Sequence, residues 1–535
     1  MKRRNFIAAS ALPLFGCERG EPSGSTLPGG FTGIAHTRGH RLRDPQTQPP
    51  GSTHRTRVLV LGGGVAGLAA ARALRQQGVD DLALLELEDE AGGNSRGGQV
   101  GGIACPLGAH YLPVPGDNAR EVQDLLEELG LRQRVAGRWA YDERTLCHSP
   151  QERLFFHGEW QEGLLPLQGV GEATLAQYRR FAETVQQAST AAKYTIPISK
   201  VPQALVQSSL DAMTFEAWLD QHDLTDTHLR WYLGYCCRDD YGAGIARVSA
   251  WAGLHYFASR HGFHAPGTEP HTDPVAHGGG VLTWPEGNGW LTRRLATPLG
   301  DRLRTGRTVT RIASHRHGVE VDAVVEATGQ TERWRAERAI VALPLFVAAR
   351  VLAEPSDAVR RAAAQAQYAP WLVANIHLRA PLHDRPGAPP SWDNVLYGSQ
   401  GLGYVDAMHQ SLRPVPGATV LTWYRALGDM PDGRRALLEQ PWTHWRDEAL
   451  RELRTAHPDL GAKASRMDIT RYGHAMAIPV PGTRTSAALQ ALRDRPADAW
   501  QRLWLAHSDL AGYSVFEEAF TLGHRAGLAT ARAGL

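Results

Sequence analysis

The feature that most constrains the fold is the segment 58–74, VLVLGGGVAGLAAARAL, in which an apolar run passes through spaced glycines into an alanine-rich stretch. The spacing Gly62-x-Gly64-x-x-Gly67 between a strand and a helix is typical of a turn that binds a dinucleotide. Gly62 permits the tight turn, Gly64 lets the backbone approach a pyrophosphate, and Gly67 lets the helix pack on the strand. The segment therefore predicts the first strand and helix of a Rossmann-like domain.

Two neighbouring features support this interpretation. The helix begins at Val65 and Ala66, where free N–H groups and the helix dipole favour phosphate. A second apolar strand, residues 82–86, ends in Glu86, nineteen residues after Gly67, where a ribose needs a hydrogen-bond acceptor. A glycine-rich turn and a solvated glutamate are each common alone, but their combined spacing favours a dinucleotide site.

Composition limits the class of protein. The 535 residues provide for two to four domains, and 42% hydrophobic with 21% charged residues is typical of a globular protein. A formal net charge of +2 gives no electrostatic reason to expect nucleic acid as a partner. Four of the five cysteines follow the N-terminal segment, and they match no metal-binding spacing: Cys105, Cys147, Cys236 and Cys237. We therefore predict no metal site and interpret these four as buried thiols, with one disulfide as the alternative.

The N-terminus resembles an export signal. Residues 3–7, Arg-Arg-Asn-Phe-Ile, and the short apolar stretch that follows are similar to a twin-arginine signal, and residues 14–17 resemble a lipoprotein cleavage box with Cys17 as the acylated residue. An uncleaved tail is the alternative. A twin-arginine signal implies export in folded form, so we expect the protein in the periplasm or cell envelope. Because no run of eighteen apolar residues occurs, we expect its body to be soluble and at most tethered by lipid.

The pattern along the chain predicts an α/β fold, in which a discontinuous Rossmann-like nucleotide domain carries an inserted α+β substrate domain. Residues from about 120 to 280 have helical spacing and few strand runs, which indicates a mostly helical insertion. The expected segments are a signal (1–17), a flexible linker (18–54), the nucleotide domain (55–120, 281–345 and 496–535) and the substrate domain (121–280 and 346–495).

From about residue 57 to 535 the sequence resembles the flavin-dependent amine oxidoreductases, which include monoamine and polyamine oxidases, L-amino-acid oxidases, protoporphyrinogen oxidases and carotenoid desaturases. The motifs that carry the resemblance are the glycine turn, Glu86, residues 92–93, residues 108–111, Val309, the strand ending in Leu343-Pro344, and residues 509–526. The resemblance implies FAD, bound non-covalently. The cofactor-binding positions that it implies are Gly62, Gly64, Val65, Ala66, Gly67, Glu86, Gly93, Asn94, Ser95, Ala109, Val309, Asp509, Val515 and Phe516.

The resemblance also implies roles within this set. Glu86 would bind the adenosine ribose, and Gly93, Asn94 and Ser95 would lie against the pyrophosphate. Val309 would contact the adenine through its backbone, and Asp509 would accept a hydrogen bond from the ribityl chain. The N–H groups near Val515 and Phe516 would support negative charge on the reduced flavin.

The catalytic residues that the resemblance implies are His110, Tyr111 and Tyr513. With Ala109, the first two would line the flavin ring near the substrate, and Tyr513 would form one wall of an aromatic cage around the amine. Structural roles stay open as alternatives: Asp509 is also compatible with a helix cap, Tyr111 and Tyr513 with the core, and His110 with a hydrogen bond to the backbone.

Three positions depart from the family pattern. Asn94 stands where an arginine commonly follows the paired glycines, so Ser95, Arg96 or the backbone would meet the pyrophosphate. No lysine follows Pro344 where many amine oxidases carry one near flavin N5, and Arg350 lies near that place. His474-Ala475 stands where some members carry a cage aromatic or a covalent flavin cysteine.

We therefore predict an FAD-dependent oxidoreductase that oxidises the C–N bond of a polyamine, monoamine or amino acid to an imine by hydride transfer. The alternatives are a desaturase or dehydrogenase of a larger apolar molecule, and a non-catalytic flavin-binding scaffold. The sequence leaves the electron acceptor open among O₂, a quinone and a redox partner. A membrane tether at Cys17 and the absent lysine favour the quinone.

Overall fold

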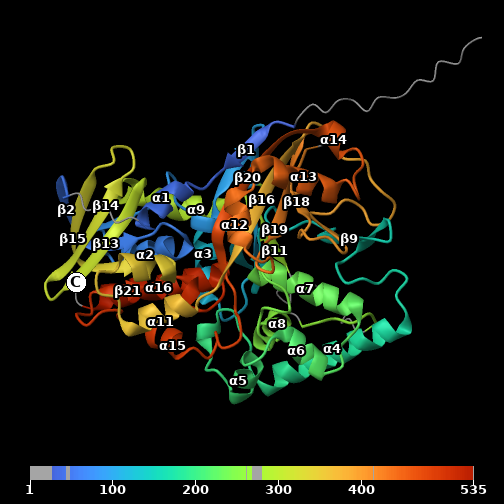
Figure 1. Ribbon diagram of the computed structural model, residues 1–535, viewed down its shortest axis with the longest axis horizontal. Coiled ribbons are helices and arrows are strands. Elements are labelled where there is room, and N and C mark those ends of the chain that lie inside the picture. The colour runs from blue at the N-terminus through green and yellow to red at the C-terminus, as the bar shows by residue number, and fades with distance from the viewer. Residues whose placement is uncertain are drawn as a thin grey trace, which may run out of the picture.

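The computed structural model describes residues 27–43, 49–260, 262–267, 280–413, 415–493 and 495–533. The predicted export signal, residues 1–17 with Cys17, lies outside the described residues. Two large sheets lie side by side, and a group of helices lies beneath the second (Figure 1). The predicted mixed α/β class is confirmed.

The first sheet forms around the strand that leads into the glycine turn. β2 (Ser52–Leu61) lies between the parallel strands β3 (Leu82–Leu85) and β15 (Thr331–Val341), and its residues 58–61 are fully buried. Such an apolar run is what a central parallel strand requires. The other strands of this nucleotide sheet are β12 (Leu303–Arg304), β13 (Arg307–His315), β14 (Gly318–Val325) and β21 (Leu503–Leu505). Strands from three separated stretches of chain thus make one sheet.

Two helices from opposite ends of the chain pack on each other beside this sheet. α2 (Val65–Gln76) follows the glycine turn, and α16 (Phe516–Arg532) is the last helix (Figure 1). A Cβ on Gly523 would lie 2.0 Å from the Ala66 carbonyl oxygen, and one on Gly527 would lie 2.6 Å from that of Ala70. The two glycines therefore set the close approach of these helices.

The second sheet has eight strands in the order β1-β20-β16-β19-β18-β17-β9-β10. Its centre is the antiparallel set β16 (Tyr368–Leu378), β19 (Thr419–Ala426) and β20 (Ala464–Ala477). The outer strands are β1 (Gly29–Thr32), β9 (Glu152–Phe156), β10 (Glu159–Glu162), β17 (Asp393–Leu396) and β18 (Tyr404–Asp406).

Two expectations from the sequence differ from this arrangement. The expected linker, residues 18–54, contains β1, which pairs with β20 through backbone hydrogen bonds that need no apolar periodicity. The expected helical insertion, residues 120–280, contains β9 and β10 of the second sheet. These strands are only four or five residues long, so their alternation is weak, and β9 joins the rest of the sheet through distant residues 393–396.

The helical unit beneath the second sheet comprises α4 (Glu172–Ala191), α5 (Leu205–Asp211), α6 (Phe215–Gln221), α7 (Thr227–Tyr241) and α8 (Ala250–Ala258). The other α-helices are α1 (His36–His40), α3 (Arg120–Glu128), α9 (Gly289–Ala296), α10 (Leu345–Val351), α11 (Asp357–Gln365), α12 (Gly433–Glu439), α13 (Trp442–Leu453), α14 (Leu460–Lys463) and α15 (Ala487–Leu492). In the described part of the chain, no helix combines the length and apolar character needed to span a bilayer.

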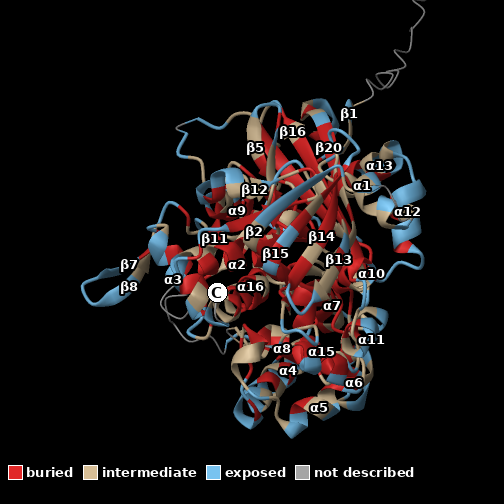
Figure 2. Cartoon of the chain, turned by 90° about the vertical axis from the view of Figure 1, so that its left-hand side faces the viewer, coloured by how far each residue is buried: buried red, intermediate tan, exposed pale blue. Residues whose placement is uncertain are grey.

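Three small antiparallel pairs complete the fold. They are β4 (Gly97–Val100) with β5 (Ile103–Pro106), β6 (Tyr111–Pro113) with β11 (Val281–Thr283), and β7 (Arg132–Val135) with β8 (Arg138–Tyr141). Figure 2 shows that the central strands are largely buried, whereas the β7–β8 hairpin is exposed. Cys105, Cys236 and Cys237 are buried free thiols, and Cys147 is a partly exposed one.

Candidate functional site

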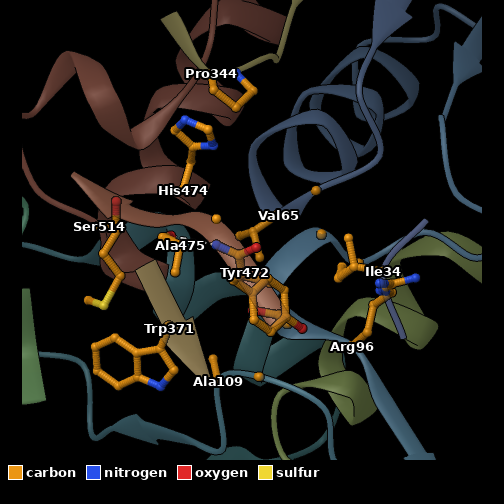
Figure 3. Close-up of a pocket in the computed structure, with 18 of the residues that line it drawn as sticks. Ile34, Val65, Arg96, Ala109, Pro344, Trp371, Tyr472, His474, Ala475 and Ser514 are labelled. Atoms are coloured by element: carbon orange, nitrogen blue, oxygen red, sulfur yellow. Dashed lines mark hydrogen bonds between the residues drawn. The ribbon is translucent and has the colours of Figure 1, made fainter. Parts of the chain in front are cut away.

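A cavity of about 1160 Å³ lies between the two sheets. Its lining includes the glycine turn, the end of β3, residues 108–111, the start of α16 and parts of β16, β19 and β20. Figure 3 shows Val65, Ala109, Trp371 and Tyr472 around this space, with Pro344 and His474 at one end and Ile34 with Arg96 at another side. A cavity of this size has room for a dinucleotide and a small second molecule.

The glycine turn has the geometry that its spacing predicts. Gly62 has a φ of +104°, which favours glycine, and a Cβ on Gly67 would lie 1.8 Å from the Gly62 carbonyl oxygen. Gly64 has an ordinary extended backbone, and its nearest neighbour, the Cα of Gly93, would be 4.0 Å from an added Cβ. Gly62, Gly64, Val65 and Ala66 line the cavity, whereas Gly67 packs behind it.

Glu86 lies at the end of β3 and faces the cavity. Its Oε2 accepts the Gly63 N–H at 2.6 Å, and its Oε1 accepts the Glu88 N–H at 2.8 Å. Burial raises the pKa of Glu86, while the two N–H donors and Arg96 oppose that rise. Each carboxylate oxygen keeps a second lone pair for a hydroxyl donor.

The loop after Glu86 adds further lining residues. Gly93, Asn94 and Ser95 form the short helix η2 (Gly93–Ser95) at the cavity. The Asn94 side chain donates to the Ala475 carbonyl at 2.6 Å, and the Asn94 carbonyl accepts the Ala109 N–H at 2.9 Å. Asn94 therefore connects this loop to β20, a role that an arginine would not fill in the same way.

Three more of the predicted cofactor-binding residues also line the cavity. Val309 lines it where the register of β13 shifts, and Val515 and Phe516 line it at the start of α16. The N-cap residue Val515 makes no side-chain hydrogen bond to the first turn of α16, and this turn faces the cavity.

Asp509 is buried in the lining. Its Oδ2 accepts the Leu345 N–H at 2.8 Å and the Tyr368 hydroxyl at 2.5 Å, and its Oδ1 lies 3.1 Å from Nδ1 of His507. Burial opposes ionisation, but these three contacts outweigh it and lower the pKa of Asp509. The residue is thus an ionised acceptor held in place by the chain.

His110 and Tyr111 form an aromatic corner of the cavity. The His110 ring stacks on Tyr424 with a centroid distance of 4.5 Å, and burial lowers its pKa to about 3, so it is neutral at neutral pH. The Tyr111 hydroxyl lies 3.4 Å from Oδ2 of Asp239, and this carboxylate together with burial raises the pKa of Tyr111. The corner therefore joins aromatic rings to a carboxylate.

The profile of the flavin-containing amine oxidoreductase family matches residues 65–527, which include most of this lining. The chain belongs to this family. Its members contain flavin, and FAD is the cofactor of this chain.

One curated relative and two solved structures illustrate what this chain is similar to. The Mycobacterium tuberculosis protein AofH, provisionally named a flavin-containing monoamine oxidase, is 29% identical over 305 residues, and the match spans 57% of this chain and 60% of AofH. A putrescine oxidase structure with bound putrescine is 16% identical, covers 89% of this chain and 99% of its own, and has a TM-score of 0.64. Cyclohexylamine oxidase from Brevibacterium oxydans is 17% identical, covers 91% and 99%, and has a TM-score of 0.63.

The residues present fit FAD. Gly64 leaves open space at a helix N-terminus where a diphosphate can approach the backbone, and Glu86 offers free lone pairs at the end of the next strand. The cavity continues from there to the start of α16. No cysteine is among the described residues that line it.

Tyr513 does not lie where the resemblance implies. It is fully buried, outside the cavity lining, and its hydroxyl donates to Oε1 of Glu518 at 3.0 Å. The reason is the turn at Gly512, whose φ of +86° precedes a phenol packed against Tyr241 and His255. The structural alternative for Tyr513 is therefore the correct one, and the aromatic cage lacks this wall.

The other departures also have structural explanations. His474 stacks on Phe346 with a centroid distance of 4.2 Å and accepts from Arg434, and burial lowers its pKa to about 4. Arg350 lines the cavity and donates to the Leu42 carbonyl at 3.2 Å. Arg350 thus connects to the N-terminal segment.

Sequence reasoning missed two groups of lining residues. Trp371, Tyr424 and Tyr472 form a floor on neighbouring strands, with Trp371 opposite Tyr472 across the ladder. Asp239 and Asp240 line the cavity from the end of α7. Each group had a signal in the sequence: the first consists of aromatic residues in apolar strands, and the second of paired acids at the end of an apolar helix. Only the strand pairing and the helix packing bring them to one cavity.

Proposed function

We propose that this protein oxidises the C–N bond of a neutral amine group in a substrate that also carries a second, positively charged group, producing an imine that water then hydrolyses. The observation that carries the proposal is the carboxylate-bearing corner of the cavity, where Asp239 and Asp240 lie beside Tyr111. The names of the putrescine and cyclohexylamine oxidases, which share the fold, are consistent with an amine substrate.

The charge balance of the corner favours a cation. Arg260 pairs with Asp240, with Nη2 at 2.8 Å from Oδ1, and so neutralises one of the two acids. Burial and the neighbouring Asp240 raise the pKa of Asp239 to about 7. Above that pH Asp239 adds a negative charge that the pair does not balance, and in a partly desolvated site such a charge attracts an ammonium group.

The rest of the cavity suits the reacting end of the amine. Bound FAD would supply the acceptor for the hydride. His110, Tyr424 and Trp371 present aromatic surfaces that exclude water, and desolvation lowers the pKa of an amine so that its lone pair is free. The N-terminus of α16 would stabilise negative charge, and neutral His110 adds no competing positive charge.

The proposed roles follow the resemblance where the lining agrees with it. Glu86 would bind the adenosine ribose, η2 and the glycine turn the diphosphate, Val309 the adenine and Asp509 the ribityl chain. His110, Tyr111 and Ala109 would face the reacting atoms. Because the lining has no cysteine among its described residues, we propose non-covalent FAD, which acid precipitation should release into the supernatant.

Asp239→Asn tests the carboxylate. We expect the KM for putrescine to rise about tenfold, or about 1.4 kcal/mol, because the amide keeps the shape and loses the charge. The KM for cyclohexylamine, which has no second ammonium group, should change less. Asp117→Asn removes an exposed carboxylate outside the cavity and is the matched control. Equal effects on both substrates would contradict the charge argument.

The pH dependence provides a separate prediction. A carboxyl whose pKa is raised to about 7 is charged above that pH and protonated below it, so the attraction is lost as the pH falls. When the pH is lowered from about 8 to about 6, the KM for putrescine should rise more in the unmodified protein than in Asp239→Asn. Parallel profiles for the two proteins would show that Asp239 does not titrate against the substrate.

A larger apolar substrate is the second candidate. The specific observation in its favour is the incomplete cage, because Tyr513 lies outside the lining and residues 474–475 supply no tyrosine, phenylalanine or tryptophan. Anaerobic titration followed at the flavin absorbance band separates the candidates. Bleaching by diamines supports the amine proposal, whereas bleaching only by a porphyrinogen or polyene supports the alternative. A bound flavin that no donor reduces would favour a scaffold role.

We also propose export in folded form to the cell envelope, acylation of Cys17 and delivery of electrons to a membrane quinone. The support is the sequence of residues 3–17 and the absence of a lysine at the Arg350 position. Cys17→Ser should move the protein from the membrane fraction to the soluble envelope fraction. Quinone reduction faster than peroxide release would support the acceptor, and peroxide as the sole product would contradict it.

A further inference from the structure

An N-terminal segment crosses the cofactor cavity. It consists of β1, α1 (His36–His40) and the short helix η1 (Arg41–Arg43), and it precedes the part of the chain that matches the family, residues 65–527. Figure 1 shows β1 beside β20 and α1 on the side of the nucleotide sheet. We call residues 33–43 the strap.

The first attachment is to the second sheet, through β1, which directly precedes the strap. β1 runs parallel to β20, with Gly29 opposite Met467 and Thr32 opposite Thr470. The Arg471 guanidinium lies over the Phe31 ring, 3.6 Å from its centroid. Directly after β1, the Gly33 carbonyl accepts from Nη2 of Arg96 at 2.5 Å, which brings the chain to the edge of the cavity beside Ile34 (Figure 3).

The second attachment is to the nucleotide sheet. The Ala35 N–H donates to Oε1 of Glu88 at 3.1 Å, two residues after Glu86. Arg38 donates to the Leu87 carbonyl at 2.9 Å and pairs with Asp89 at 2.9 Å. These contacts are with the loop that leaves β3, where the ribose acceptor lies.

The third attachment joins the strap to Glu326, after β14, and to α10. Nη2 of Arg41 lies 3.1 Å from Oε2 of Glu326, and Nε of Arg38 lies 3.7 Å from the same atom. Glu326 is largely buried and follows β14. At the end of the strap, the Leu42 carbonyl accepts from Arg350 of α10. Polar contacts thus tie the strap to both sheets and to α10.

Between these attachments, the strap itself lines the cavity. Ile34, His36, Gly39, His40, Leu42 and Arg43 face the same space as Glu86, Gly93 and Val309. A molecule held by those three residues is therefore enclosed on one side by the strap. Arg38 and Arg41 are paired with carboxylates, whereas Arg43 lines the cavity and places a positive charge beside it, which suits an anionic diphosphate group.

We propose that the strap is a second part of the FAD site, which encloses the adenosine diphosphate half and must detach before FAD leaves. Three polar attachments would have to break together, so they act chiefly on the dissociation rate. The inference depends on FAD binding and not on the identity of the substrate. It can therefore fail while the amine proposal stands, and the reverse also holds.

The test measures release of FAD from the purified full-length holoprotein, followed by the fluorescence of free flavin after dilution. Arg38→Ala/Arg41→Ala removes both contacts to Glu326 and those to Leu87 and Asp89. We expect FAD release to become about tenfold faster or more, with unchanged far-ultraviolet circular dichroism. Arg55→Ala/Arg120→Ala removes two exposed arginines outside the strap and its partners, and should leave the release rate unchanged.

Hydrogen exchange gives a readout independent of the variants. Amides of residues 33–43 should exchange more slowly in the holoprotein than after FAD has been removed, while those of the β7–β8 hairpin should not change. If the double variant does not fold, Glu326→Gln removes the charge that both arginines meet and retains an acceptor for the Thr308 hydroxyl. An unchanged release rate in a folded variant, or equal exchange with and without FAD, would overturn the proposal.

Discussion

Replacing Gly64 by leucine is expected to leave the protein folded and to abolish FAD binding at ordinary concentrations. Gly64 has φ −71° and ψ −177°, a conformation open to any residue, and an added Cβ would meet nothing closer than 4.0 Å. The side chain would therefore enter the cavity at the start of α2, where the diphosphate approaches the backbone. We expect FAD affinity to fall by at least about 100-fold, or about 2.8 kcal/mol.

The measurement is the ratio of flavin to protein absorbance after gel filtration, together with titration of the apoprotein with FAD. Gly116→Leu is the control, because Gly116 is exposed, has no positive φ and has nothing within 4 Å of an added Cβ. Full FAD occupancy in Gly64→Leu would show that the cofactor does not approach this turn.

Gly523→Ala is expected to destabilise the fold strongly, although it adds only one methyl group. Its Cβ would lie 2.0 Å from the Ala66 carbonyl oxygen and 2.8 Å from the Ala66 Cα, which are backbone atoms of α2 that cannot rotate away. The two helices must move apart, and overpacking of this kind costs about 3 kcal/mol of stability or more. Because Ala66 and the start of α16 both line the cavity, FAD binding should weaken as well.

The comparison is with Gly234→Ala in α7. That position is also a helical glycine, but its added Cβ would meet only Nη1 of Arg238 at 3.8 Å. The helix propensity of alanine should then stabilise the protein by up to about 1 kcal/mol. Thermal unfolding of the two apoproteins, monitored by tryptophan fluorescence, measures the difference. Equal midpoints would mean that α2 and α16 adjust to the extra methyl group at no cost.

Much of the cofactor side was predictable from short stretches of sequence. Gly62, Gly64 and Gly67 act within one strand-turn-helix unit, so their spacing specifies the turn. Glu86 follows the next parallel strand, and such strands end at the same edge of the sheet. The family resemblance likewise predicted that Asp509, Val515 and Phe516 lie at the cofactor, and all three line the cavity. Tyr513, in the same run of sequence, lies outside the lining.

The remaining site depends on pairings between distant residues. Trp371, Tyr424 and Tyr472 lie on three strands separated by about fifty residues each along the chain, and the ladder register decides that they share one face. Asp239 reaches Tyr111 only because α7 packs under the second sheet. Tyr513 has the expected place in the sequence, but core packing turns its hydroxyl to Glu518.

The sequence by itself determined the nucleotide turn, the class of fold and the family, because these rest on the geometry of neighbouring residues and on motif order. Only the tertiary structure decided that the segment before β2 encloses the cavity. Residues 29–43 carry no apolar period, and they are held by backbone pairing with β20 and by ion pairs to Asp89 and Glu326. Such contacts are set by which surfaces meet in the folded chain, and local sequence does not encode that choice.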